Sequence, residues 1–182
     1  YDDVAREPEL PVVAEGIRRA NESSAEVVIG LGGGSAMDTA KAAAVLLTNE
    51  GPAKNYQGQN LVARPGVNMI MVPTTAGTGS EVTSNAAITD SARHYKMSLR
   101  SPYIIPSLSL LDPSLLATLP ASIAAESSMD AIIHAAEAFV SNRSNALSDA
   151  LATEALEYLC PNIRPFIAAR SNQAAAEKML LG

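Results

Sequence analysis

The sequence predicts an α/β part followed by an all-helical part. Apolar runs at 26–31 and 67–72 are typical of short buried strands, and each runs directly into a glycine-rich turn. Beyond Pro120 the chain is alanine-rich and helix-periodic, with few β-branched runs. We therefore expect residues 1–118 to form the α/β part and residues 119–182 to begin the helical part.

The α/β part has recognisable elements in chain order. Apolar residues recur at helical spacing over 10–20, where Pro11 suits a first helical turn, and the run 36–48 is rich in alanine and leucine, which favour helix. Two short strands are expected to pair around the polar turn 90–94. The expected elements are helices at 10–20 and 36–48 and strands at 26–31, 67–72, 85–89, 95–99 and 104–111.

Two local features of the helical part carry expectations. Pro161 and Pro165 are expected to break the long helical pattern, because proline lacks an amide hydrogen and its ring clashes with the preceding turn. Cys160, the single cysteine, excludes an internal disulfide framework and a cysteine-based zinc cluster. We expect its thiol to lie buried in the core on a helix.

Composition and charge narrow the class of partner. Of the 182 residues 47% are apolar and 18% charged, as in a globular protein with a real core, and the net charge of -6 disfavours nucleic acid and anionic membranes. No apolar run approaches the ~18 residues of a membrane span. We expect a cytoplasmic protein that acts on a small molecule. Because the chain opens at Tyr1 and stops at Gly182 directly after an apparent helix, we expect an internal fragment of a longer protein.

A glycine-rich loop follows the first predicted strand and opens a helix. Gly32, Gly33, Gly34 and Ser35 would present bare backbone N–H groups and the positive end of the helix dipole to an anion such as a phosphate. Ser35 can cap the helix or donate to the same oxygens, and Asp38 in the first turn suits the dipole. The alternative is a tight turn with an N-cap, which explains Ser35 and one glycine but not three. The loop matches neither G-x-G-x-x-G nor the Walker pattern.

A second loop of small residues leaves the strand at 67–72. Thr74, Thr75, Thr78 and Ser80 place four hydroxyls on a glycine frame, where they can donate to pyrophosphate or amide oxygens of a nucleotide. Ligand crevices of open sheets lie at such strand ends, which favours binding over a merely polar turn. Lys96 is a candidate for neutralising phosphate, with an exposed strand lysine as the alternative.

One pair of residues has the spacing of metal ligands. Asp130 and His134 lie four residues apart in a helical segment, so both side chains point the same way and a carboxylate oxygen and an imidazole nitrogen can share a divalent ion. A cap and a surface or core-satisfied histidine are the alternative. A catalytic ion usually needs at least three protein ligands. The other histidine, His94, lies in a polar turn and is expected to be solvated, so the chain is expected to lack part of the site.

Three segments, in order, resemble the iron-containing (group III) alcohol dehydrogenase family: 32–41, 73–81 and 129–138. The resemblance runs through nearly the whole chain, including Asp112, Pro113 and the stretch at 119–120. It implies a dehydroquinate-synthase-like fold, in which a Rossmann-related α/β domain that binds NAD(P) precedes a helical metal-binding domain. Residues 1–118 and 119–182 would be parts of those two domains.

The resemblance also implies roles for the candidate residues. The loop at 32–35 would hold the pyrophosphate, with Asp38 adjacent, and the threonines at 74, 75 and 78 would line the cofactor cleft with Lys96. Asp130 and His134 would be two of four ligands to Fe(II), possibly Zn, the others being later histidines. The implied reaction is hydride transfer between a small alcohol and NAD or NADP, with the metal as Lewis acid.

Two alternatives stay open at this point. The same fold resemblance admits a zinc- and NAD-dependent sugar-phosphate cyclase of the dehydroquinate synthase type, although the residues at 74–81 are more similar to those of the alcohol dehydrogenases. The other alternative is a catalytically incomplete fragment. Because a truncated parallel sheet exposes strand edges, we also expect a homo-oligomer.

Overall fold

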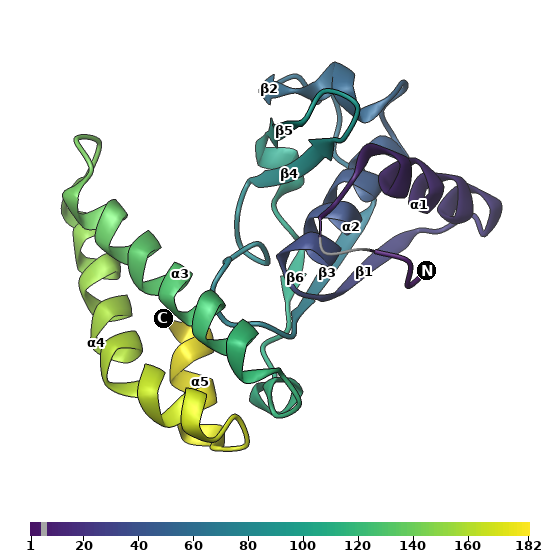
Figure 1. The fold of residues 1–182 in the computed structure, drawn as a ribbon. Helices are drawn as coiled ribbons and strands as arrows, with labels where there is room; N and C mark the ends of the chain where they lie inside the picture. Colours follow the sequence, from purple (N-terminus) through teal and green to yellow (C-terminus); the bar gives the residue numbers. More distant parts are fainter. Residues whose placement is uncertain (5–6) are drawn as a thin grey trace. The chain divides into compact units, whose positions relative to one another are not determined.

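The computed structural model describes residues 1–4 and 7–182, and these form two compact units (Figure 1). The first unit contains 1–73 and 80–110, and the second contains 74–79 and 111–182. The segment 74–79, which carries the predicted threonine site, therefore belongs to the helical unit, although sequence reasoning kept it with the α/β part. The assignment of 1–118 and 119–182 to cofactor and metal binding stays a prediction.

The first unit is built on a parallel sheet of three described strands in the order β1-β3-β6: β1 (Val27–Gly32), β3 (Asn68–Pro73) and β6 (Leu108–Ser109). Gly32 lies opposite Pro73, so both predicted loops leave the same edge of the sheet. Helix α2 (Gly34–Leu46) follows β1 and packs against β1 and β3, and α1 (Leu10–Glu22) packs against α2.

A second sheet of the same unit has the order β2-β5-β4. It consists of β2 (Gly58–Gln59), β4 (Asn85–Asp90) and β5 (Tyr95–Arg100). Strands β4 and β5 are antiparallel, which confirms the predicted pairing, and His94 adopts a left-handed φ of 49° in their turn. Two short 3-10 helices, η1 (Ala53–Tyr56) and η2 (Pro102–Ile104), complete the unit.

One apolar core joins both sheets to α2. Met37, Met71, Ile88 and Leu99 are fully buried within it. The strand expected at 104–111 is wrong for most of its length, because η2 occupies its first residue and only Leu108 and Ser109 pair with β3.

The second unit is helical, as predicted. It contains η3 (Pro113–Leu116), α3 (Ala121–Val140), α4 (Ala146–Ala168) and α5 (Gln173–Leu181). Helix α4 packs against both α3 and α5 around Leu159, Phe166 and Met179, which are buried. Asn145 and Ser148 form a capping box at the start of α4, because each side chain bonds the backbone of the other residue. No helix in the described part of the chain is long and apolar enough to cross a bilayer.

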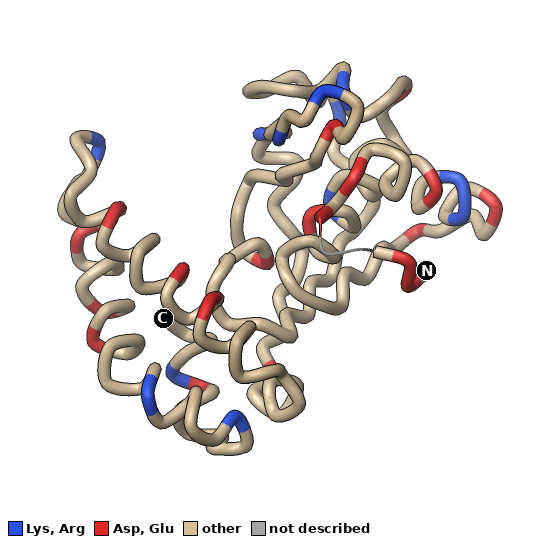
Figure 2. Tube along the Cα trace, viewed as in Figure 1, with Lys and Arg blue, Asp and Glu red and all other residues tan. Residues whose placement is uncertain are grey.

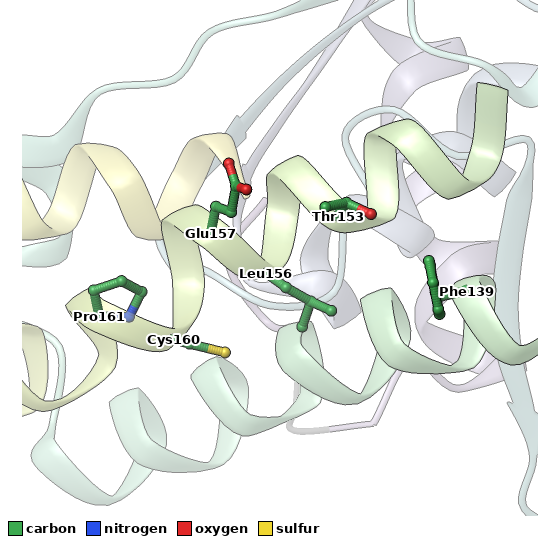
Figure 3. A pocket seen from close by; sticks show the side chains of 6 residues that line it. All are labelled: Phe139, Thr153, Leu156, Glu157, Cys160 and Pro161. Carbon is green, nitrogen blue, oxygen red and sulfur yellow. The ribbon is translucent and has the colours of Figure 1, made fainter. Parts of the chain in front are cut away.

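Two expectations for α4 were wrong. The helix continues through Pro161 and Pro165, because each proline removes one helical hydrogen bond while packing against two neighbouring helices supports the rest. Cys160 is exposed rather than buried. It follows Leu159, which occupies the buried stripe, so its side chain lies on a different face and lines a pocket with Phe139 and Leu156 (Figure 3).

Candidate functional site

The glycine loop has the backbone geometry of a tight turn from strand into helix. Gly32 has a φ of 147°, and a Cβ at this position would lie 2.7 Å from the Cβ of Ala36. Helix α2 begins at Gly34 with Gly33 as N-cap, and no side chain caps it there. Ser35 therefore lies inside the helix and is not the cap, contrary to one expectation. A glycine N-cap puts no side chain of its own over the backbone N–H groups at the start of α2, which suits an anion.

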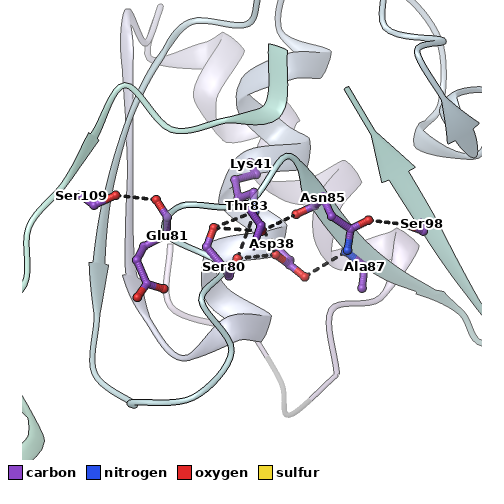
Figure 4. A network of polar contacts seen from close by, with 9 residues as sticks. All are labelled: Asp38, Lys41, Ser80, Glu81, Thr83, Asn85, Ala87, Ser98 and Ser109. Atoms are coloured by element: carbon purple, nitrogen blue, oxygen red, sulfur yellow. Dashed lines mark hydrogen bonds and ion pairs between the residues drawn. The ribbon is translucent and has the colours of Figure 1, made fainter. Parts of the chain in front are cut away.

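Asp38 and Ser80 are brought together in the first unit (Figure 4). The Ser80 hydroxyl donates to one Asp38 carboxylate oxygen at 2.5 Å, and the backbone N–H of Ala87 donates to the other at 2.9 Å. Asp38 lies beyond the first helical turn, so the expected interaction of its carboxylate with the helix dipole is not found. Both residues thus join α2 to the chain that follows the threonine loop, and their contact with a cofactor stays a prediction.

Sequence reasoning assigned no role to Lys41, which lies at the centre of the same network. Its side chain is fully buried and its ammonium donates to Ser80 and Thr83. The signal was present in the helical spacing, because Lys41 follows Met37 by four residues on the face of α2 that enters the core. Burial lowers the pKa of Lys41, and the Asp38 carboxylate opposes that shift. Burial also raises the pKa of the neighbouring Glu81.

The threonine loop is in backbone contact with α3 inside the second unit. A Cβ at Gly77 would lie 2.2 Å from the carbonyl oxygen of Ser127, so only a glycine fits there. The hydroxyl of Thr75 is buried and has no hydrogen-bond partner among the described residues. Such a hydroxyl fits a loop that donates to a ligand. The neighbouring Ala76 is buried in the core of the unit, which holds the loop in place.

Asp130 and His134 converge on α3, about one turn beyond Ser127. Asp130 Oδ1 lies 3.6 Å from His134 Nε2, and the two side chains are 48% and 52% exposed. The acidic residues of this helix are Glu126, Asp130 and Glu137, and it carries no lysine or arginine (Figure 2). The pair is therefore an accessible oxygen and nitrogen donor set on an acidic helix, which fits a divalent ion.

The pair does not make a complete metal site. Among the residues described, no group of three or more His, Cys, Asp or Glu side chains is placed to hold an ion. A catalytic ion with at least three protein ligands would thus need further donors.

The remaining candidates lie elsewhere. Lys96 is on β5 with its side chain 62% exposed, and its ammonium lies 3.7 Å from the Glu7 carboxylate. Its contacts in the described chain do not include Asp38 or Ser80. His94 is exposed in the hairpin turn, as expected.

The chain matches two family models in succession. The model for iron-containing alcohol dehydrogenase matches residues 1–113, and that for the C-terminal part of the Fe-containing alcohol dehydrogenase family matches residues 124–182. These matches cover the strand, loop and helix arrangement of the first unit and the helices of the second. The chain belongs to the iron-containing alcohol dehydrogenase family.

Individual relatives agree with this family. The chain is 38% identical over 180 residues to a sulfoacetaldehyde reductase of Bilophila wadsworthia, covering 99% of this chain and 46% of that protein. It is 38% identical over 167 residues to an NAD-dependent methanol dehydrogenase of Bacillus methanolicus, covering 92% and 44%. The crystal structure of a 1,3-propanediol oxidoreductase superimposes with a TM-score of 0.96 at 33% identity, covering 100% of this chain and 47% of that one.

The chain thus spans about half the length of the curated relatives it matches. These relatives are dehydrogenases and reductases, so the sugar-phosphate cyclase alternative is not favoured.

Proposed function

We propose that this chain forms the cofactor-binding part and half of the metal site of a metal-dependent alcohol dehydrogenase. The enzyme would transfer a hydride between a small alcohol, or the corresponding aldehyde or ketone, and a nicotinamide cofactor. The observation that carries this proposal is the convergence of Asp130 and His134 on the helix whose preceding turn contacts Gly77 of the threonine loop. Family membership supports the same reaction class.

Each part of the chain has a proposed role. The loop of Gly32, Gly33, Gly34 and Ser35 would hold the pyrophosphate of NAD or NADP at the start of α2. Three threonines and Lys96 would donate hydrogen bonds to the cofactor, the threonines being Thr74, Thr75 and Thr78.

The chemistry depends on groups that these residues would hold. Asp130 and His134 would hold Fe(II) or Zn, which suits their oxygen and nitrogen donors. When bound, the ion supplies a Lewis acid for the alcohol or carbonyl oxygen and the nicotinamide supplies the hydride chemistry. The protein residues contribute placement, because Gly77 and Ser127 keep the threonine loop against the helix that carries both donors. With two donors from this chain, we propose that the 182 residues alone are inactive.

The ligand assignment is tested in the full-length enzyme with Asp130→Asn and His134→Ala. Both variants are expected to lose bound metal, measured by elemental analysis, and to lose alcohol-dependent reduction of NAD or NADP. Cofactor binding, measured by fluorescence titration, is expected to stay close to wild type, because neither substitution changes the glycine loop or the threonines proposed to bind the cofactor. His94→Asn is the matched control, since His94 is exposed and asparagine tolerates its left-handed φ. Unchanged metal content in Asp130→Asn would refute the assignment.

We also propose a homo-oligomer in the cytoplasm. Strand β1 lies at an edge of the described sheet, and Ile29 and Leu31 on it are 64% and 60% exposed. An apolar edge of this kind favours pairing with another chain. Light scattering tests the oligomer, and a monodisperse monomer would count against it. The single cysteine suits a reducing compartment, which cell fractionation tests.

A further inference from the structure

The most unusual buried group outside the proposed metal site is the ammonium of Lys41. The Lys41 side chain is fully buried in the middle of α2. Its three N–H donors make three hydrogen bonds: 2.8 Å to the Ser80 carbonyl, 3.2 Å to the Ser80 hydroxyl and 3.0 Å to the Thr83 hydroxyl. Asp38 Oδ1 lies 3.5 Å away as its counter-ion. The hydrogen-bonding capacity of this ammonium is fully used inside the protein.

A buried charge at this position is a poor way to increase the free energy of unfolding. Burying an ammonium carries a large desolvation cost, and a buried ion pair is often no more stabilising than well-packed apolar side chains of similar volume. Met37, Ala42 and Ala44 of the same helix are apolar and fully buried, and Asp38 is the charged neighbour of Lys41 on α2. An apolar residue would therefore fill this site at a lower desolvation cost. The presence of an ammonium is explained instead by its hydrogen bonds to Ser80 and Thr83.

Lys41 holds part of an irregular stretch of backbone between β3 and β4. Residues 80–84 lie between β3 and β4 outside any helix or strand. Ser80 follows Gly79, which has a left-handed φ of 60° and ends the threonine loop. The Ser80 carbonyl accepts from Lys41 and the Ser80 hydroxyl donates to Asp38 (Figure 4). Two side chains one turn apart on α2 therefore bind the same residue.

We propose that Lys41 is a positioning residue for the cofactor: it fixes Ser80, and thereby the end of the threonine loop, in the conformation that binds the nicotinamide nucleotide. This inference rests on the proposed function, because it concerns the same loop. Lys41 itself would contact neither cofactor nor substrate. Its three bonds would fix Ser80 and Thr83, which directly follow the segment that carries the threonines at 74, 75 and 78.

The test measures nucleotide affinity in the full-length enzyme. Lys41→Met keeps the length of the side chain and removes every donor. The dissociation constant for NADH or NADPH is expected to rise at least about tenfold, because charged hydrogen bonds that order the loop are lost. Bound metal is expected to stay unchanged, since the bonds of Lys41 go to Ser80 and Thr83 and not to Asp130 or His134. Wild-type affinity in a folded Lys41→Met protein would overturn the inference.

Chemical rescue separates positioning from a general effect on the fold. In Lys41→Ala, added propylammonium is expected to restore nucleotide affinity toward wild type, because it supplies the missing donors in the space left by the side chain. Tetramethylammonium at equal ionic strength, which has no N–H donor, is the control and is expected to restore nothing. Equal rescue by both cations, or by neither, would overturn the inference.

A milder variant keeps the test decisive where the lysine variants fail to fold. Thr83→Val keeps the ammonium and removes one of its acceptors. Weaker nucleotide binding at an unchanged melting temperature supports the inference, and wild-type binding refutes it. A wild-type enzyme that binds neither NADH nor NADPH would overturn the proposed function as well, whereas an effect missing only from the variants would overturn the inference alone.

Discussion

Gly77→Ala should separate the threonine loop from the helix that carries the proposed metal ligands. The added Cβ would lie 2.2 Å from the Ser127 carbonyl oxygen and 2.7 Å from its carbonyl carbon. Both atoms are backbone, so no flexible side chain can move away. Real Cβ atoms essentially never approach another heavy atom closer than 3.0 Å, and the distance must open by about 0.8 Å from 2.2 Å. Overpacking of this kind costs about 1–3 kcal/mol.

The effect on activity should exceed the effect on stability. Asp130 lies about one turn along α3 from Ser127, so displacement of the helix at this contact moves the metal ligands relative to the loop. Misplacement of reacting groups by about 1 Å can reduce the rate about 100-fold. We expect kcat/KM of the full-length enzyme to fall by about that factor, and the melting temperature to fall by several degrees.

Gly79→Ala is the matched control for this variant. Gly79 has a φ of 60°, and no atom lies within 4 Å of a Cβ built there, so the control adds backbone strain without a clash. That strain costs about 1–2 kcal/mol, a destabilisation comparable to Gly77→Ala. Steady-state kinetics, elemental analysis and thermal denaturation are compared for both variants. Equal losses of activity in the two variants, or near-wild-type activity in Gly77→Ala, would refute the role of the Gly77 contact.

Three further changes have defined outcomes. Gly32→Ala should destabilise by about 1–3 kcal/mol and weaken nucleotide binding, because it combines a φ of 147° with a 2.7 Å approach to Ala36; titration with NADH or NADPH measures the loss. Burial raises the pKa of Glu81, so its stability contribution is greatest below pH 4.5 and is lost as pH rises toward the folded pKa. Glu81→Gln should therefore raise the melting temperature at pH 7, and an advantage that persists in full below pH 4.5 would contradict this cause. Asn145→Ala removes the cap of α4 and should cost about 1 kcal/mol without changing cofactor affinity, which denaturation and titration check.

Local periodicity was enough to predict where several of the candidate residues lie in the fold. The spacing of Asp130 and His134 places two side chains on one face of any helix, so their convergence needed no tertiary information. The apolar runs at 26–31 and 67–72 predicted the two neighbouring strands whose ends release both loops. Glycines after the first run predicted a loop from strand into helix, where Gly32 adopts a φ of 147° that favours glycine.

Contacts between distant segments could not be predicted in this way. A lysine in a helix is normally solvent-exposed, and Lys41 is buried because residues 80–83 supply its acceptors, about 40 positions along the chain. The prolines of α4 would end an isolated helix, but packing against α3 and α5 maintains it. The sequence did not indicate that Gly77 packs against the backbone of Ser127.

The sequence alone determined the succession of strands, turns and helices and the pairing of one carboxylate with one imidazole, because these depend on residues a few positions apart. The tertiary structure decided which hydroxyls are engaged inside the protein, which lysine is buried, and which unit holds the threonine loop. The physical reason is that burial and hydrogen-bond partners depend on segments that meet only after the chain has folded.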